Sequence, residues 1–157
     1  MKKICILLST LVLFISFSSA QEVIRVQPCN DTMIQRQADS VKSVFSKQGY
    51  NVLREASITM ESEYEMPVVV QLKERGLYQV VFIGDITSKL YEVRMYDWNE
   101  KMVTYQKKMW GDVDGNIISY SYQPRFTEFH MIKPLQVNKQ KKKGLCGYIM
   151  LLQKVKP

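Results

Sequence analysis

The fold is decided by residues 76–122, which read GLYQVVFIGDITSKLYEVRMYDWNEKMVTYQKKMWGDVDGNIISYSY. Four segments of this stretch alternate side chains with a period of two, which is the pattern of β-strands. Residues 77–84 are apolar on both faces and predict a central strand, whereas Glu92 and Arg94 put one face of the next strand in water. Short turns rich in Gly, Asp and Asn separate the segments. The stretch therefore predicts a meander of about four strands.

Residues 32–48, upstream of this stretch, have the spacing of an amphipathic helix. Asn30-Asp31-Thr32 supplies residues that favour a helix N-terminus, and Gly49 is suited to the position after its end. The apolar stripe consists of Ile34, Ala38, Val41 and Phe45. We expect this helix to lie across a sheet or to cover one end of a sandwich.

The other strands are expected at residues 50–60, 68–70, 126–132 and 145–153. Arg54 interrupts the alternation of the first, which leaves its register open, and Pro134 ends the third. The count predicts a mainly β protein: a single-domain, jelly-roll-like antiparallel β-sandwich of about eight strands with one N-terminal helix. An α+β fold, with the helix in the concavity of one curved sheet, is the alternative.

Residues 1–20 have the features of a secretory signal peptide. Lys2 and Lys3 precede an apolar run at 4–17, and small residues end at Ala20. We expect cleavage there, leaving residues 21–157 as one β-sandwich domain exported to the periplasm, the cell surface or the extracellular space. The apolar run is too short to span a membrane and no second long run follows, so no transmembrane segment is expected in the mature chain.

Cys29 and Cys146 remain after removal of the signal, near opposite ends of the mature chain. An oxidising compartment favours a disulfide between them. The alternative is that Cys146, in an apolar run, is a small buried side chain. Since His130 stands alone and neither cysteine has near neighbours of ligand type, the spacing predicts neither a metal site nor a cofactor.

Charge is unevenly distributed along the chain. Residues 21–100 carry 9 basic and 12 acidic side chains, a net charge of −3, whereas residues 101–157 carry 11 and 3, a net charge of +8. The basic turn with Lys141, Lys142 and Lys143 could attract an anionic glycan, a lipid head group or an envelope protein, and export makes nucleic acid the least expected partner. Alternatively, these lysines keep an exposed turn soluble and protect a sheet edge.

Aromatic side chains are frequent in residues 76–122. Rings on an exposed sheet face stack on sugars, but aromatic residues are also favoured inside β-sandwiches. Trp98 and Trp110 are the strongest candidates for a ligand-binding surface, because both lie at predicted turns.

Asp112 and Asp114 place oxygen atoms at alternate positions of one turn, which is a weak calcium pattern. An ordinary hairpin turn explains the same residues. No nucleophile and base occur in a recognisable signature, and we expect His130, the sole histidine, on the wet face of its strand. A hydrolase would need paired carboxylates, drawn from Asp85, Asp97, Asp112 and Asp114.

Three short segments carry a resemblance to a known family: Gly76-Leu77-Tyr78 leading to Phe82, residues 90–97 with the Asp-Trp-Asn turn, and residues 120–124 leading to Phe129. Together they resemble small secreted bacterial jelly-roll modules of the pre-peptidase C-terminal type. The resemblance implies an accessory, non-catalytic module, in which some relatives hold calcium and some bind polysaccharide. The signal followed directly by Gln21 resembles those of Gram-negative Bacteroidota, which implies the periplasm or the cell surface.

The sequence thus predicts an exported, non-catalytic binding or envelope-associated accessory protein. The ligand is a glycan, a lipid head group or a protein. A small carboxylate-based secreted hydrolase is the alternative function.

Overall fold

A computed structural model describes residues 27–113 and 115–155. Its elements are α2 (Thr32–Lys47), β1 (Tyr50–Met60), β2 (Val68–Leu72), β3 (Tyr78–Gly84), β4 (Leu90–Tyr96), β5 (Met102–Met109), β6 (Ile117–Tyr122), β7 (Glu128–Val137) and β8 (Leu145–Lys154). The predicted signal peptide, its cleavage site and Asp114 lie outside the described residues.

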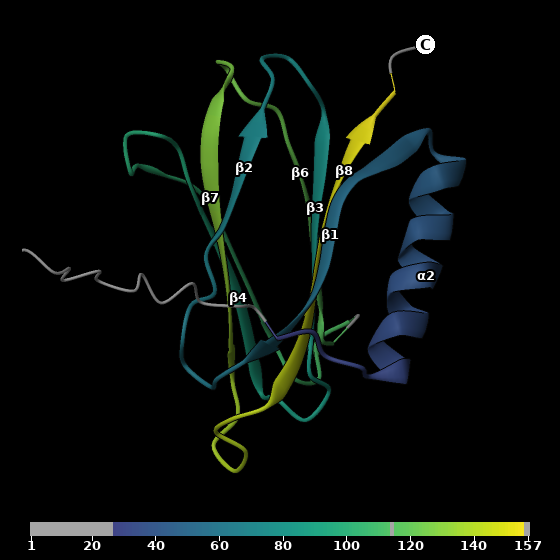
Figure 1. Ribbon diagram of the computed structural model, residues 1–157, viewed down its shortest axis with the longest axis vertical. Helices are drawn as coiled ribbons and strands as arrows, with labels where there is room; N and C mark the ends of the chain where they lie inside the picture. Colours follow the sequence, from purple (N-terminus) through teal and green to yellow (C-terminus); the bar gives the residue numbers. More distant parts are fainter. Residues whose placement is uncertain (1–26, 114, 156–157) are drawn as a thin grey trace, which may run out of the picture.

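The strands form two antiparallel sheets that face each other (Figure 1). The first sheet has the order β1-β8-β3-β6, and the second has the order β2-β7-β4-β5. The pairs β1 with β8, β2 with β7, β3 with β6 and β4 with β5 are nested along the chain. A long hairpin rolled up in this way is a jelly roll. The predicted β-sandwich is therefore confirmed, and the alternative with one curved sheet is wrong.

The predicted meander is wrong, although its strands are placed correctly. β3 lies between β8 and β6 in the first sheet, whereas β4 lies between β7 and β5 in the second. Only β4 and β5 form the expected hairpin. The turns after β3 and after β5 carry the chain from one sheet to the other, and the alternation within a strand does not specify its partner.

Two apolar clusters hold the layers together. One fills the space between the sheets, and the other lies between α2 and the outer face of the first sheet. In the second cluster, Ile34 and Ala38 of the helix pack with Val81 of β3 and Met150 of β8. Both faces of β3 and β8 are therefore buried, which explains their continuous apolar character. The helix covers the first sheet, and no other described element covers the outer face of the second (Figure 1).

Two strands depart from the sequence expectation for local reasons. The register of β1 shifts between Val52 and Arg54, which places Arg54 on the same face as Ala56, and its exposed guanidinium donates across to the carbonyl of Val69 of β2 at 3.0 Å. Pro134 lies inside β7 instead of ending it. Its carbonyl accepts the N–H of Met66 at 3.0 Å, on the side away from β4. Because the nitrogen of a strand residue points to the same side as its carbonyl, the missing N–H of Pro134 costs no hydrogen bond to β4.

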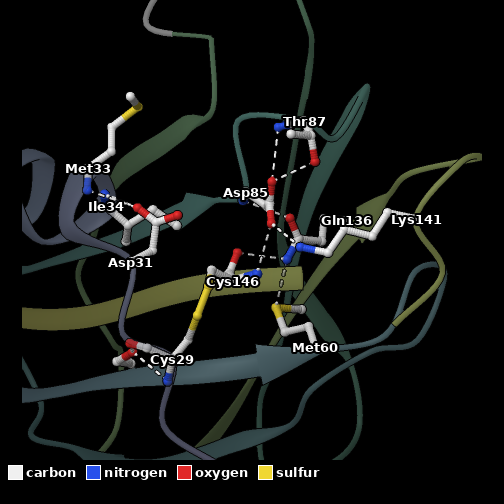
Figure 2. Close-up of a disulfide and its surroundings, with 11 residues drawn as sticks. Cys29, Asp31, Met33, Ile34, Met60, Asp85, Thr87, Gln136, Lys141 and Cys146 are labelled. Atoms are coloured by element: carbon white, nitrogen blue, oxygen red, sulfur yellow. Dashed lines mark hydrogen bonds and ion pairs between the residues drawn. A yellow bond between two sulfur atoms is a disulfide. The ribbon is translucent and has the colours of Figure 1, made fainter. Parts of the chain in front are cut away.

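A disulfide joins Cys29 to Cys146, as predicted, with Cα atoms 5.6 Å apart and a separation of 117 residues (Figure 2). It fastens the segment before α2 to β8, and the N–H of Cys29 also donates to Ser57 Oγ of β1 at 3.0 Å. A disulfide is typical of an oxidising, extracytoplasmic setting, while the compartment itself stays a prediction. In the described ranges, no helix has the length and apolar character needed to cross a membrane.

Candidate functional site

The loops of the sandwich gather at two ends (Figure 1). The turns after β2, β4 and β6 lie at what we call the Trp98 end, and those after β1, β3, β5 and β7 at the lysine end. Trp98 follows β4 and Trp110 follows β5, so the length of β5 separates them. An extended strand of 8 residues is about 25 Å long. The two tryptophans therefore do not form one patch.

Trp98 is displayed by a tightly bonded turn. The carboxylate of Asp97 accepts the backbone N–H groups of Asn99 and Lys101, both at 2.9 Å. This arrangement leaves Trp98 69% exposed. Its ring packs at a tilt on Phe129 of β7, with 5.9 Å between the ring centroids, and Phe129 is itself 45% exposed. The pair makes an exposed aromatic surface at this end.

A groove of about 580 Å³ lies at the same end of the sandwich. Its size is within the range of small-molecule sites. Asp97 and Glu128 line the groove, whereas Trp98 and Phe129, their neighbours in the chain, adjoin it without lining it, and Phe129 points to the opposite face of β7 from Glu128. The lining residues are Asp97, Asn99, Lys101, Met102, Val103, Tyr122, Gln123, Arg125, Phe126 and Glu128. We call this the Trp98-end groove.

Tyr122 connects the groove to a buried histidine. Its hydroxyl lies 3.1 Å from Nε2 of His130, which is 1% exposed. The expectation of a histidine on the wet face is wrong, because His130 shares the inward face of β7 with Ile132. Burial raises the pKa of Tyr122, as do the carboxylates of Glu128 and Asp97, while Arg125 acts in the opposite direction. The phenol therefore remains protonated at neutral pH and can donate a hydrogen bond.

The groove has no dominant charge. Its two acidic residues, Asp97 and Glu128, are balanced by Lys101 and Arg125. Amide side chains and the Tyr122 phenol add planar polar groups, and Phe126 adds a ring that is 66% exposed. Such a surface can hydrogen-bond hydroxyl groups and cover C–H groups without requiring a charged ligand.

The predicted basic turn carries its own counter-charges. Lys141 lies 3.5 Å from Asp85, Lys142 lies 3.6 Å from Glu63, and Lys143 lies 3.6 Å from Glu61. The pairs of Lys142 and Lys143 sit in exposed positions, where each contributes little to stability, whereas Asp85 is buried. They nevertheless mean that the turn is not an unopposed cationic surface.

Asp85 has a structural position at the lysine end (Figure 2). Burial alone would raise its pKa, but hydrogen bonds from the Thr87 hydroxyl and N–H and from the Cys146 N–H, together with Lys141, lower it. Asp85 and Asp97 lie at opposite ends of β4, a strand of 7 residues. The resulting separation of about 20 Å is too large for two carboxylates that share a cleft.

The calcium pattern also has a local explanation. Asp112 accepts the backbone N–H of Met109 at 2.7 Å and so stabilises its own turn. Over residues 27–113 and 115–155, no three His, Cys, Asp or Glu side chains come together as metal ligands. Asp114 is outside these ranges, so the calcium hypothesis stays a prediction.

Asp97 is the one groove residue that the sequence analysis singled out, and the chemically important residues that it missed include Tyr122, Arg125 and Phe126. Residues 123–125 indicated only a turn, and Tyr122 was one of several aromatic residues assigned to a strand. An exposed phenylalanine directly after a proline turn is the one signal that could have singled out Phe126.

Comparison with known proteins gives only distant likenesses. No protein-family model and no curated protein matches the chain. A carbohydrate-binding module described as "CBM4 structure and function" aligns over 67% of this chain and 77% of its own, with 13% identity and a TM-score of 0.42. The Gap123 glycosylation-associated protein complex of Streptococcus agalactiae aligns over 67% of this chain and 39% of its own, with 9% identity and a TM-score of 0.35.

The coat protein of tobacco streak virus aligns over 67% of this chain and 90% of its own, with 9% identity and a TM-score of 0.29. None of these likenesses assigns a residue or a ligand to this chain. The resemblance to pre-peptidase C-terminal modules accordingly gains no sequence-level match.

Proposed function

We propose that this protein is a non-catalytic glycan-binding module and that the Trp98-end groove is its binding site. The exposed ring pair of Trp98 and Phe129 beside the groove is the observation that carries the proposal. The face of an aromatic ring is electron-rich, and the C–H groups on one side of a sugar ring carry partial positive charge. A sugar therefore stacks favourably on such rings and hydrogen-bonds the polar groups next to them.

Charge balance supports an uncharged glycan rather than the anionic partner expected from the lysine-rich turn. The groove carries equal numbers of acidic and basic side chains. An anionic sugar would gain from Arg125 and Lys101 but would be repelled by Asp97 and Glu128. The lysine turn lies at the other end of the sandwich and is no part of this site.

Hydrolysis remains the competing function, because the groove contains the two carboxylates that a hydrolase would need. Asp97 and Glu128 both line the groove and are its carboxylates. However, one oxygen of Asp97 already accepts two backbone N–H groups, so this side chain holds its turn together. Binding without cleavage is the expected behaviour.

Retention on a glycan array and on insoluble polysaccharides tests the proposal, followed by calorimetry with the retained sugar. We expect Trp98→Ala and Phe126→Ala each to weaken binding about tenfold, which corresponds to the loss of one aromatic stacking contact. Trp110→Ala is the matched control, because it removes an indole of similar exposure at the opposite end. A triple Lys141, Lys142 and Lys143 to Ala variant should bind like the unaltered protein.

Two results would overturn this assignment. Equal retention by the Trp98→Ala and Trp110→Ala variants would remove the groove as the site. New reducing ends released from the retained glycan, and lost in Glu128→Gln, would replace binding by hydrolysis.

A further inference from the structure

A second groove lies at the lysine end, on the outer face of the second sheet. Its volume is about 490 Å³, within the range of small-molecule sites. The lining residues are Thr87, Lys89, Leu90, Met109, Val137, Asn138, Lys139 and Gln140. We call it the lysine-end trough.

The floor of the trough is a row of apolar side chains on three adjacent strands. Leu90 of β4 pairs with Val137 of β7 on one side and with Met109 of β5 on the other. Because Tyr91 points into the core between the sheets, Leu90 points to the outer face. Met109 is 55% exposed. We call Val137, Leu90 and Met109 the apolar row. This row exposes apolar surface to solvent at the floor of the trough.

Cations border this apolar row. Lys89 and Lys139 line the trough, and neither has an acidic partner within 4.0 Å in the described part of the chain. The ammonium group of Lys89 lies 4.0 Å from the centroid of the Trp110 ring, which holds it at the rim. The trough therefore combines an apolar floor with two ammonium groups that form no ion pair with an acidic side chain of residues 27–113 or 115–155.

The described acidic side chains near the trough are bonded to other groups. Asp112 accepts the backbone N–H of Met109 at 2.7 Å, and Asp85 accepts the backbone N–H of Thr87 at 3.0 Å. Glu92 lies one row further along the sheet and is 7% exposed. Its carboxylate accepts from Arg94 at 2.7 Å and from the Tyr105 hydroxyl at 3.1 Å. Glu92 is thus neutralised within the protein and does not face the lysines of the trough as a free charge.

We propose that the lysine-end trough binds a single acyl chain that carries an anionic head group, such as a fatty-acid carboxylate. The chain lies on the apolar row, where its burial removes apolar surface from water. The head group lies between Lys89 and Lys139. This site is separate from the Trp98-end groove and does not depend on glycan binding.

A single lipid molecule fits these features better than a membrane surface. The apolar floor is enclosed by the loops after β3 and β7, and beyond it the same face carries Glu92, Arg94 and Glu65 in a charged network. A bilayer lying on this whole face would have to desolvate that network. A single acyl chain in the trough would leave that network hydrated.

The fluorescence of Trp110 offers a direct test. The chain has 2 tryptophans, so a Trp98→Phe background leaves Trp110 as the sole reporter. The purified protein is titrated with dodecanoate below its micelle concentration, and in parallel with dodecyl maltoside, dodecyltrimethylammonium and inorganic phosphate. We expect a saturable change with dodecanoate and none at the same concentrations of the other probes.

Substitutions then locate the site. Lys89→Gln and Lys139→Gln should each weaken dodecanoate binding about two- to fivefold, the size of an exposed charge contact. Met109→Ser should weaken it about tenfold through lost apolar contact. Lys47→Gln is the matched control, since it removes the same charge from the exposed end of α2 on the other sheet, and it should leave binding unchanged.

Several outcomes would overturn the proposal. Equal affinity for dodecanoate and dodecyl maltoside would show that Lys89 and Lys139 do not contribute to binding. An equal response to inorganic phosphate would show that the trough binds anions without using the apolar row. Binding to vesicles of phosphatidylcholine and phosphatidylglycerol without binding of monomeric dodecanoate would assign the face to a membrane surface instead.

Discussion

The side-chain oxygen of Gln136, in the second sheet, accepts the backbone N–H of Asp85, which follows β3 of the first sheet, at 2.8 Å. The same oxygen accepts the hydroxyl of Ser88 at 3.0 Å, and the amide nitrogen donates to the carbonyl of Cys146 at 3.0 Å. Gln136 is 0% exposed. One buried amide therefore joins the two sheets at the lysine end, where a purely apolar core would leave these backbone groups without partners.

Gln136→Met tests how much this amide contributes. Methionine fills a similar volume but leaves the Asp85 N–H, the Ser88 hydroxyl and the Cys146 carbonyl buried without their bonds. We expect the free energy of unfolding to fall by about 3 kcal/mol, measured by denaturant titration. Gln71→Met, an exposed position on the neighbouring strand β2, should change it by less than about 0.5 kcal/mol. Equal effects of the two substitutions would contradict the assigned role.

Asp85→Asn predicts a pH-dependent loss of stability. The folded pKa of Asp85 is lowered despite burial, because Thr87, the Cys146 N–H and Lys141 favour the carboxylate. Its contribution is therefore present above the unfolded pKa of about 4 and is lost as the pH falls through the folded value. We expect the variant to be less stable by about 1 to 3 kcal/mol at pH 7. The difference should shrink as the solution is acidified below about pH 4.

The stability of the two proteins is compared by thermal unfolding at each pH. A stability difference that stays constant over that range would show that ionisation of Asp85 is not responsible for it. Asp39→Asn is a suitable control, since Asp39 pairs with Lys42 on the surface of α2 at a side-chain exposure of 74%.

Removing the disulfide predicts a large loss of stability without loss of the fold. Cys29 and Cys146 close a loop with a separation of 117 residues. The chain-entropy model gives an upper value of about 4 to 5 kcal/mol for a loop of that length. We expect a variant with both cysteines changed to serine to unfold at lower denaturant concentration, and dithiothreitol to shift only the unaltered protein to the same midpoint. An unchanged midpoint after reduction would contradict the prediction.

Strand positions were predictable because the polarity of each side chain indicates whether it is buried. The continuous apolar character of β3 and β8 indicated central strands, and the alternation around Glu92 and Arg94 indicated a strand with one wet face. Pairing was not predictable in the same way. The jelly roll joins β3 to β6 and β8, which lie far along the chain, and nothing within a strand names its neighbour.

The candidate site was only half predictable for a related reason. Trp98 was singled out because a tryptophan in a polar turn has no core to enter. Tyr122 and Arg125 could not be singled out from the sequence, because they line the groove only when the turn after β6 lies beside the turn after β4. Neighbouring residues of a turn are visible in sequence, whereas a groove between turns depends on the pairing of their strands.

Gly147 marks the place in β8 where the core has no room for a side chain. A Cβ atom there would lie 2.8 Å from Met60 Sδ and 3.2 Å from Phe82 Cε2, on the two flanking strands. Alanine normally suits a strand better than glycine, but this overlap must be relieved by moving neighbours. We expect Gly147→Ala to lower the free energy of unfolding by about 1 to 3 kcal/mol.

A double-mutant cycle with Met60→Val separates crowding from any change in backbone freedom. Valine withdraws the thioether that the new methyl group would strike, so the double variant should be more stable than the sum of the two single effects predicts. The expected coupling is about 1 kcal/mol, read from denaturant midpoints at a common slope. Strict additivity would show that the added methyl group is not in conflict with Met60, which would contradict the assigned cause of the destabilisation.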